Sequence, residues 1–137
     1  QAGDAGDPVT VNTSAIVRGS LLLSAYRNAT ISAADTAIAA ETISRTAHTT
    51  PTVAGADTDS WVVSHWADKT ASTTSWAAPG GQIVRLTGAE TGAGHLSWLL
   101  TDSGTGVPAG TVGGLTATAN SATTNATMAT VVLTPTG

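Results

Sequence analysis

Short runs of β-branched and aromatic residues, separated by turns, constrain the fold of this chain more than any other feature. The runs have strand length, and Gly, Pro, Asp and Asn gather between them. Within the runs apolar and polar residues alternate: Leu96, Trp98 and Leu100 lie on the opposite face of an extended chain from His95 and Ser97. This pattern predicts an all-β fold, and more specifically an antiparallel β-sandwich of jelly-roll or Ig-like form with about eight or nine strands.

The turn positions set the expected bounds of the strands. We expect strands over Val9–Asn12, Ile16–Tyr26, Thr42–Val53, Trp61–Ala67, Thr73–Ala77, Gln82–Leu86, His95–Leu100, Leu115–Ala119 and Met128–Leu133. The Ala-rich stretch from Ser32 to Glu41 departs from the pattern, because Ile31, Ala34 and Ile38 fall near helical spacing. A helix there would bury little apolar surface, so a loop or a strand of small residues is favoured, with a short helix as the alternative.

Length and composition indicate one domain without covalent cross-links. The chain has 137 residues, of which 41% are hydrophobic and none is Cys, so a core is feasible and a disulfide framework is excluded. We therefore treat residues 1–137 as a single domain, with residues 1–8 as a candidate extended N-terminal arm. The net charge of −4 is spread without a basic cluster, which disfavours nucleic acid as a partner. No apolar run approaches the ~20 residues needed to span a membrane.

Few residues of this chain could carry catalysis. Only 10% of the residues are charged, and the three His residues, His48, His65 and His95, fall on separate expected strands. A catalytic pocket needs titratable groups that converge, and no Gly-x-Ser-x-Gly elbow marks a nucleophile. Asp57 and Asp59 lack the further acidic ligands of a calcium loop, so a solvated turn is expected there. We expect no enzyme activity, no catalytic residue, no metal site and no cofactor.

The four Trp residues are the main candidates for ligand contacts. With no Phe and one Tyr in the chain, they must also supply most of the large core side chains. Trp61 and Trp66 lie five positions apart on one expected strand, so they point to opposite faces, one of them toward the core. Trp76 precedes a Pro-Gly-Gly turn, where an exposed ring fits, and Trp98 is expected to be buried. If Trp76 and one of Trp61 or Trp66 were exposed and coplanar on one face, they would indicate a carbohydrate-binding module.

The phase of the alternation also predicts the core. The residues expected to fill it are Val17, Leu21, Leu23, Val63, Trp98, Leu100, Val131 and Leu133. Truncating Leu21 or Leu100 to Ala is therefore expected to cost about 2–5 kcal/mol, because each would leave a cavity. Substitutions at Thr116 or Thr118, on the polar phase, should stay within about 1 kcal/mol.

Four sequence blocks together resemble a known family. They are Asp59–Lys69 (DSWVVSHWADK), Thr74–Gly80 (TSWAAPG), Thr101–Thr111 (TDSGTGVPAGT) and Gly114–Ala119 (GLTATA). They resemble a β-sandwich module of secreted, multi-domain proteins of actinobacteria and of tail or surface proteins of their phages, over most of the span from Val9 to Leu133. The Trp-Ala-Asp-Lys block is the most specific of them. The resemblance implies an extracellular or virion location and brings no catalytic residue with it.

Composition and resemblance together predict a structural role. We expect a non-enzymatic module of an extracellular surface or a phage virion, which associates with itself or with neighbouring structural proteins through sheet edges and faces. Related modules have further strands before the part that matches Val9, which here would leave an open sheet edge. We expect a terminus of a neighbouring subunit to fill that edge in a homo-oligomer or filament, with Gln1–Thr13 and Thr130–Gly137 as candidate donors. The alternative function is a carbohydrate-binding module whose partner is a surface glycan.

Overall fold

The regular structure of this chain is almost entirely β. The computed structural model describes residues 8–15 and 19–136, which contain eleven strands and one 3₁₀ helix, η1 (Ala33–Asp35), but no α-helix. Nothing helical in these ranges has the length and hydropathy to cross a membrane. The prediction of an all-β fold is confirmed.

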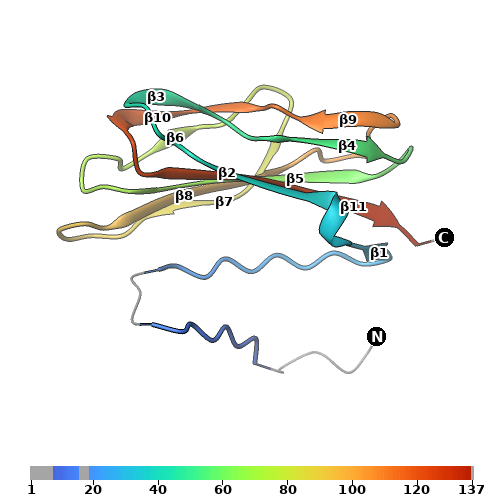
Figure 1. Cartoon of the computed structure of the whole chain (residues 1–137), viewed down its shortest axis with the longest axis horizontal. Helices are drawn as coiled ribbons and strands as arrows, with labels where there is room; N and C mark the ends of the chain where they lie inside the picture. The colour runs from blue at the N-terminus through green and yellow to red at the C-terminus, as the bar shows by residue number, and fades with distance from the viewer. Residues whose placement is uncertain (1–7, 16–18, 137) are drawn as a thin grey trace.

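Six strands form the first sheet, and all of their pairings are antiparallel (Figure 1). In order across the sheet they are β7 (Ile83–Ala89), β8 (Leu96–Asp102), β5 (Trp61–Lys69), β11 (Ala126–Pro135) and, along the other side of β11, β1 (Ala29–Thr30) and β2 (Thr36–Ala40). The register places Trp66 of β5 opposite Leu99 of β8 and Met128 of β11. Because side chains alternate across a strand, these three share one face of the sheet.

Five strands form the second layer, which lies over the first sheet in Figure 1. They are β3 (Arg45–Thr49), β10 (Thr116–Thr123) and β6 (Trp76–Ala77), together with the pair β4 (Thr52–Ala56) and β9 (Gly110–Gly113). The N–H of Thr50 donates a 2.9 Å hydrogen bond to the carbonyl of Leu115, which joins the two parts where β3 continues into β4. Gly113 and Gly114, both at positive φ, make the bend between β9 and β10. The two layers form the predicted antiparallel sandwich.

The core between the layers is built on one large aromatic side chain. Trp66 is fully buried and packs with Leu99 and Met128 of the first sheet and with Ala117 of the second. Its indole N–H donates a 2.9 Å hydrogen bond to the carbonyl of His48, on β3. A buried Trp therefore fills the interior and at the same time ties the two layers together.

A second polar tie lies two residues further along β5. Asp68 is buried, and its carboxylate accepts hydrogen bonds from the hydroxyls of Thr73 and Thr123, the latter at 2.9 Å. Thr123 belongs to β10, so this contact also crosses between the layers. The Trp-Ala-Asp-Lys block of the sequence thus has a structural explanation, because Trp66 and Asp68 share the inward phase of β5 and both bind the opposite layer.

The predicted core is right in its alternation and partly wrong in its members. Val63, Leu100 and Leu133 are buried, but they form a separate cluster on the face of the first sheet that points away from the second layer. Leu21 and Leu23 were expected in the core and are instead 61% and 63% exposed. Trp98 and Val131 are half-buried, and Val17 lies outside the described residues. The core between the layers is instead formed by the other face of β5 and β8, which carries Trp66 and Leu99. The alternation that was expected to face inward lies on the outward side of this sheet.

Several strand predictions also need correction. Val9–Asn12 and the described part of Ile16–Tyr26 form no strand, whereas β1 and β9 were not anticipated. The Ala-rich stretch becomes η1 followed by β2, which agrees with the favoured strand of small residues. Residues 130–135 of the C-terminal candidate donor belong to β11, which pairs within this chain with strands on both sides. Residues 1–7 of the N-terminal candidate, Gln1–Thr13, lie outside the described residues.

Candidate functional site

The first sheet presents a second apolar face on its outer side, away from the second layer. We call it the outer face. Its residues come from the outward phase of three neighbouring strands: Trp61, Val63, His65 and Ala67 of β5, Leu96, Trp98 and Leu100 of β8, and Ala129, Val131 and Leu133 of β11. An ordinary sandwich has polar side chains on the outward phase of its sheets. An apolar outer face is ordinarily covered by another segment of the chain or by a partner.

Residues 19–28, which we call the arm, run across this face as an extended segment, drawn in blue below the sheet in Figure 1. Leu22 and Tyr26 pack on the outer-face cluster around Val63, Leu100 and Leu133. Within the described residues, no backbone–backbone hydrogen bond holds residues 19–27. The arm therefore touches the sheet through side chains, and the main-chain N–H and C=O groups of residues 19–27 have no partner among the described residues.

A buried carboxylate fastens the arm to the sheet. Asp102, at the end of β8, is fully buried and accepts a 2.9 Å hydrogen bond from the hydroxyl of Tyr26. Arg85 donates to the same carboxylate through Nε at 2.6 Å and Nη2 at 3.0 Å. The N–H of Gly104 adds a fourth bond at 2.9 Å. We call Tyr26, Arg85 and Asp102 the Asp102 cluster.

Local structure explains how Arg85 reaches this carboxylate. The ladder between β7 and β8 pairs Val84 with Thr101 and Leu86 with Leu100, so Arg85 is the extra residue of a β-bulge. A bulge turns a side chain out of the regular alternation, which lets the guanidinium meet Asp102 on the outer face. The bulge also disrupts the exposed edge of β7.

The charges in the cluster are mutually supported. Burial opposes ionisation of Asp102, but the hydrogen bonds from Arg85, Tyr26 and Gly104 outweigh it and lower the pKa of this carboxyl. The hydrogen bond to Asp102 raises the pKa of Arg85. Burial, reinforced by the carboxylate, raises the pKa of Tyr26. At neutral pH the cluster is therefore an ion pair with a neutral phenol as donor.

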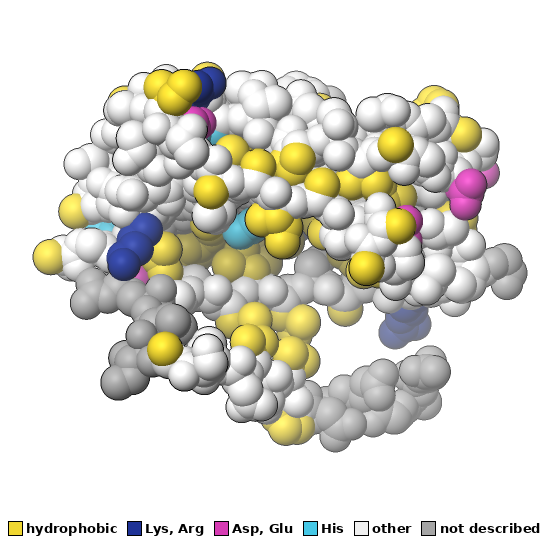
Figure 2. Space-filling model, in the orientation of Figure 1, with side chains coloured by type: hydrophobic (Ala, Val, Ile, Leu, Met, Phe, Trp, Pro, Cys, Tyr) yellow, Lys and Arg dark blue, Asp and Glu magenta, His cyan; other side chains and the backbone are white. Residues whose placement is uncertain are grey.

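The arm leaves part of the outer face uncovered. Two hollows of about 470 and 250 Å³ lie along residues 19–23, the first lined by Leu86 and Trp98 and the second by His65 and Trp98. Figure 2 shows hydrophobic side chains beside an open space below the sandwich. Protein interiors are packed to crystal-like density. Because hollows remain between the arm and the outer face, their contact is not packed like a protein core.

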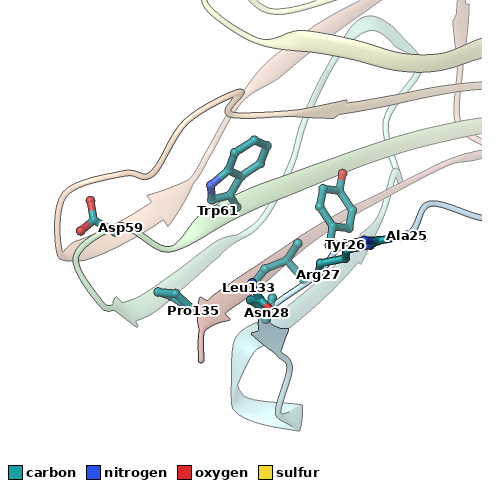
Figure 3. Close-up of a pocket in the computed structure, with 9 residues that line it drawn as sticks. Ala25, Tyr26, Arg27, Asn28, Asp59, Trp61, Leu133 and Pro135 are labelled. Atoms are coloured by element: carbon teal, nitrogen blue, oxygen red, sulfur yellow. The ribbon is translucent and has the colours of Figure 1, made fainter. Parts of the chain in front are cut away.

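A third hollow, of about 380 Å³, lies where the arm ends (Figure 3). It is lined by residues 25–29, by Asp59 and Trp61, and by Leu133 and Pro135 of β11. The rings of Tyr26 and Trp61 meet edge to face there, with centroids 6.2 Å apart. The hollow therefore has aromatic and aliphatic walls and a polar rim.

The three tryptophans of the alternative reading do not share a face. Trp66 is in the core, and Trp76 is half-buried on β6, where its indole N–H donates to Ser97 at 3.0 Å. Trp61 is half-buried on the outer face, opposite in phase to Trp66 as the spacing predicts. The exposed, coplanar pair of Trp76 with Trp61 or Trp66 that would have indicated a carbohydrate-binding module is not formed by these residues.

The remaining candidate residues lie apart. His48 is on β3, His65 on β5 and His95 beside Thr73, and the described residues hold no group of three His, Asp or Glu side chains that could bind a metal. Asp57 and Asp59 flank a turn, in which the carbonyl of Asp57 accepts a 3.2 Å hydrogen bond from Ser60. A turn agrees with the sequence prediction at that position.

The Asp102 cluster was not predicted from the sequence pattern. A signal was present, since Arg85 interrupts the apolar run Ile83-Val84-Arg85-Leu86 and Asp102 ends the apolar strand that begins at Leu96. Charged residues in such positions are rarely buried unless they are paired. Their partnership with Tyr26 follows only from the path of the arm, which the local pattern does not specify.

Comparisons with protein-family models, with curated proteins and with solved structures found no match for this chain.

Proposed function

We propose that this chain is a non-enzymatic structural module that assembles with copies of itself or with neighbouring structural proteins, on an extracellular surface or in a virion. Assembly uses the outer face and the arm that crosses it. The sequence blocks that resemble modules of actinobacterial surface proteins and phage tails support the location. The free main chain of the arm supports the mode of association.

One observation carries the proposal. Residues 19–27 are extended over the outer face, have no backbone–backbone hydrogen bond to a described residue, and point Leu21 and Leu23 outward. An extended segment with free N–H and C=O groups and alternating apolar side chains is a template for an added strand. A strand from a neighbour would pair with the arm, cover Leu21 and Leu23, and close the incomplete contact with the outer face.

The chemistry of the described residues supports a structural role over a catalytic one. The buried carboxylates, Asp68 and Asp102, are each occupied by hydrogen bonds from the protein itself. The Nε2 atom of His65 is buried without a hydrogen-bond partner, but no carboxylate orients its ring as a catalytic base requires. Both carboxylates serve to join segments of the fold.

Sedimentation velocity over a range of protein concentrations tests the proposal. The double variant Leu21→Ser/Leu23→Ser should shift the mass toward the monomer, because it removes the apolar side chains that a neighbour would cover. Ile43→Ser is the matched control, since Ile43 is 59% exposed in the loop between β2 and β3, away from the arm. A wild-type chain that stays monomeric at every concentration contradicts the proposal, and so does a double variant that associates like the wild type.

A further inference from the structure

The hollow at the end of the arm combines features that the assembly role does not need. Three segments far apart in the sequence meet there: the end of the arm, the turn before β5 and the end of β11 (Figure 3). Its volume of about 380 Å³ lies at the small end of the range for ligand pockets, roughly 300–1,000 Å³. This size suits a ligand of one or two rings.

The aromatic walls of this hollow are held in place and leave one donor free. The hydroxyl of Tyr26 is bound to Asp102, which fixes the Tyr26 ring against Trp61. The indole N–H of Trp61 donates to no described residue. Figure 3 shows the nitrogen-bearing edge of Trp61 on the side of Asp59, within the hollow. Half-buried indole N–H groups ordinarily have a partner.

The polar rim is also unpaired. The side chains of Arg27, Asn28 and Asp59 make no hydrogen bond or ion pair with a described residue, and all three line the hollow. Asn28 (φ 54°) and Asp59 (φ 66°) are the two non-Gly residues at positive φ within the described ranges. Non-Gly residues seldom adopt this left-handed conformation, although Asn and Asp tolerate it, and here both flank the same hollow.

From these groups we propose that the hollow binds a neutral saccharide of one or two pyranose rings. A pyranose has an apolar C–H face that stacks on aromatic rings and a rim of hydroxyls that both donate and accept hydrogen bonds. Trp61 and Tyr26 supply the apolar wall, the carboxylate of Asp59 accepts, and the guanidinium of Arg27 and the indole N–H donate. One cation, Arg27, and one anion, Asp59, line the hollow, so its lining has no net charge, which favours a neutral sugar over an acidic one.

This site differs from a tryptophan platform and has a consequence for the arm. Trp61 takes part, whereas Trp66 and Trp76 lie elsewhere. Because the hollow is lined by the arm on one side and by the sheet on the other, a bound sugar would contact both and favour the attached position of the arm. Saccharide binding would therefore couple to whatever the arm does in assembly.

Saturation-transfer NMR on the full chain tests the site. The sugar probes are glucose, galactose, mannose, N-acetylglucosamine, cellobiose and chitobiose. Hexaproline represents the alternative ligand, a proline-rich peptide, because such peptides also dock in grooves lined by aromatic rings. We expect at least one sugar to bind in the millimolar range or tighter. Asp59→Asn should weaken that binding about tenfold through loss of a charge-assisted hydrogen bond. Asn tolerates positive φ, so this variant keeps the turn.

Two further variants make the result decisive. Asp57→Asn alters the same turn at a residue that does not line the hollow, so sugar binding should be unchanged. Trp61→Phe keeps an aromatic wall but removes the indole N–H, so binding should weaken. The proposal is overturned if no sugar binds, if hexaproline binds in their place, or if sugar binding is insensitive to both Asp59→Asn and Trp61→Phe.

Discussion

The hydroxyl of Tyr26 donates a 2.9 Å hydrogen bond to the buried carboxylate of Asp102, 76 residues further along the chain. Together with the packing of Leu22 on the outer face and the 2.8 Å hydrogen bond from the hydroxyl of Ser20 to Glu90, this bond holds the arm in place. Arg85 and Gly104 hold the same carboxylate from the sheet side, so the acceptor is preorganised before the arm arrives. The arm has no backbone–backbone hydrogen bond to another described residue, so this side-chain bond is a connection from which the arm could detach.

Removing the Tyr26 hydroxyl should loosen the arm without unfolding the sandwich. We expect Tyr26→Phe to cost about 1 kcal/mol, the net value of one hydrogen bond, since Asp102 keeps its other donors. Trypsin cleavage after Arg27 should accelerate, because Arg27 is exposed in the arm. Cleavage after Arg45, on β3, is the internal control and should keep its rate. Equal acceleration at both sites would mean that the whole fold is weakened.

Removing the carboxylate should be more damaging than removing the hydroxyl. Asp102→Ala leaves Arg85 without its ion pair and the N–H of Gly104 without an acceptor, in addition to freeing Tyr26. Thermal unfolding should therefore show a larger drop in Tm for Asp102→Ala than for Tyr26→Phe. A smaller drop in Tm for Asp102→Ala than for Tyr26→Phe would show that the carboxylate contributes less to stability than its hydrogen bonds indicate.

Truncating a Leu side chain should reduce the free energy of unfolding much more in the interior than in the arm. Leu99→Ala should cost about 2–5 kcal/mol, because Leu99 is almost fully buried against Trp66. Leu21→Ala should stay within about 1 kcal/mol under dilute conditions, because this side chain is mostly exposed. Denaturant unfolding of the two variants distinguishes them, and a large loss at Leu21 in the monomer would contradict the position of the arm.

These expectations show which parts of the fold can be predicted from local sequence. Alternation placed Trp61 and Trp66 on opposite faces, because a strand has a side-chain period of two whatever its partners are. It could not say which face looks inward, because the more apolar phase of β8 faces outward, whereas its inward phase carries Ser97 and Thr101 on either side of Leu99. Leu21 and Leu23 have the pattern of a core strand, but their segment has no strand beside it.

Other elements depend on contacts between distant segments. β9 (Gly110–Gly113) is half Gly, which argues against a strand locally, and its pairing with β4 is what makes it one. The hollow at Trp61 needs the arm, a turn and the end of β11 to meet. The Asp102 cluster likewise requires a bulge at Arg85 and an arm that returns over the sheet. The spacing of residues along the chain does not predict such contacts between distant segments.

Two glycines at positive φ should respond differently to the same substitution. A Cβ at Gly113 would collide with the carbonyl oxygen of Pro51 and crowd Thr130, whereas a Cβ at Gly55 would meet open space. Gly55→Ala should cost about 1–2 kcal/mol from backbone strain. Gly113→Ala should cost about 3 kcal/mol or more, because overpacking adds to the strain. Equal losses in denaturant unfolding would mean that β4 and β9 do not pack as described.

Acidification should destabilise the fold through His65. Burial lowers the pKa of this side chain, so below about pH 6.5 the unfolded state binds a proton that the folded state does not. Stability is therefore complete above the ordinary His pKa and falls as the pH drops toward the lowered one. Tm should fall between about pH 7.5 and about pH 5.5 less steeply in His65→Gln than in the wild type. Identical slopes would assign the effect to other groups.

Hydrogen–deuterium exchange of the arm amides as a function of protein concentration tests assembly through the arm most directly. At high dilution the amides of residues 20–27 should exchange rapidly, because no backbone–backbone hydrogen bond to a described residue protects them. As the concentration rises and the sedimenting mass increases, alternate amides of this segment should become protected, as pairing along one edge of an added strand requires. Assembly that proceeds while residues 20–27 exchange at the dilute rate would contradict the account.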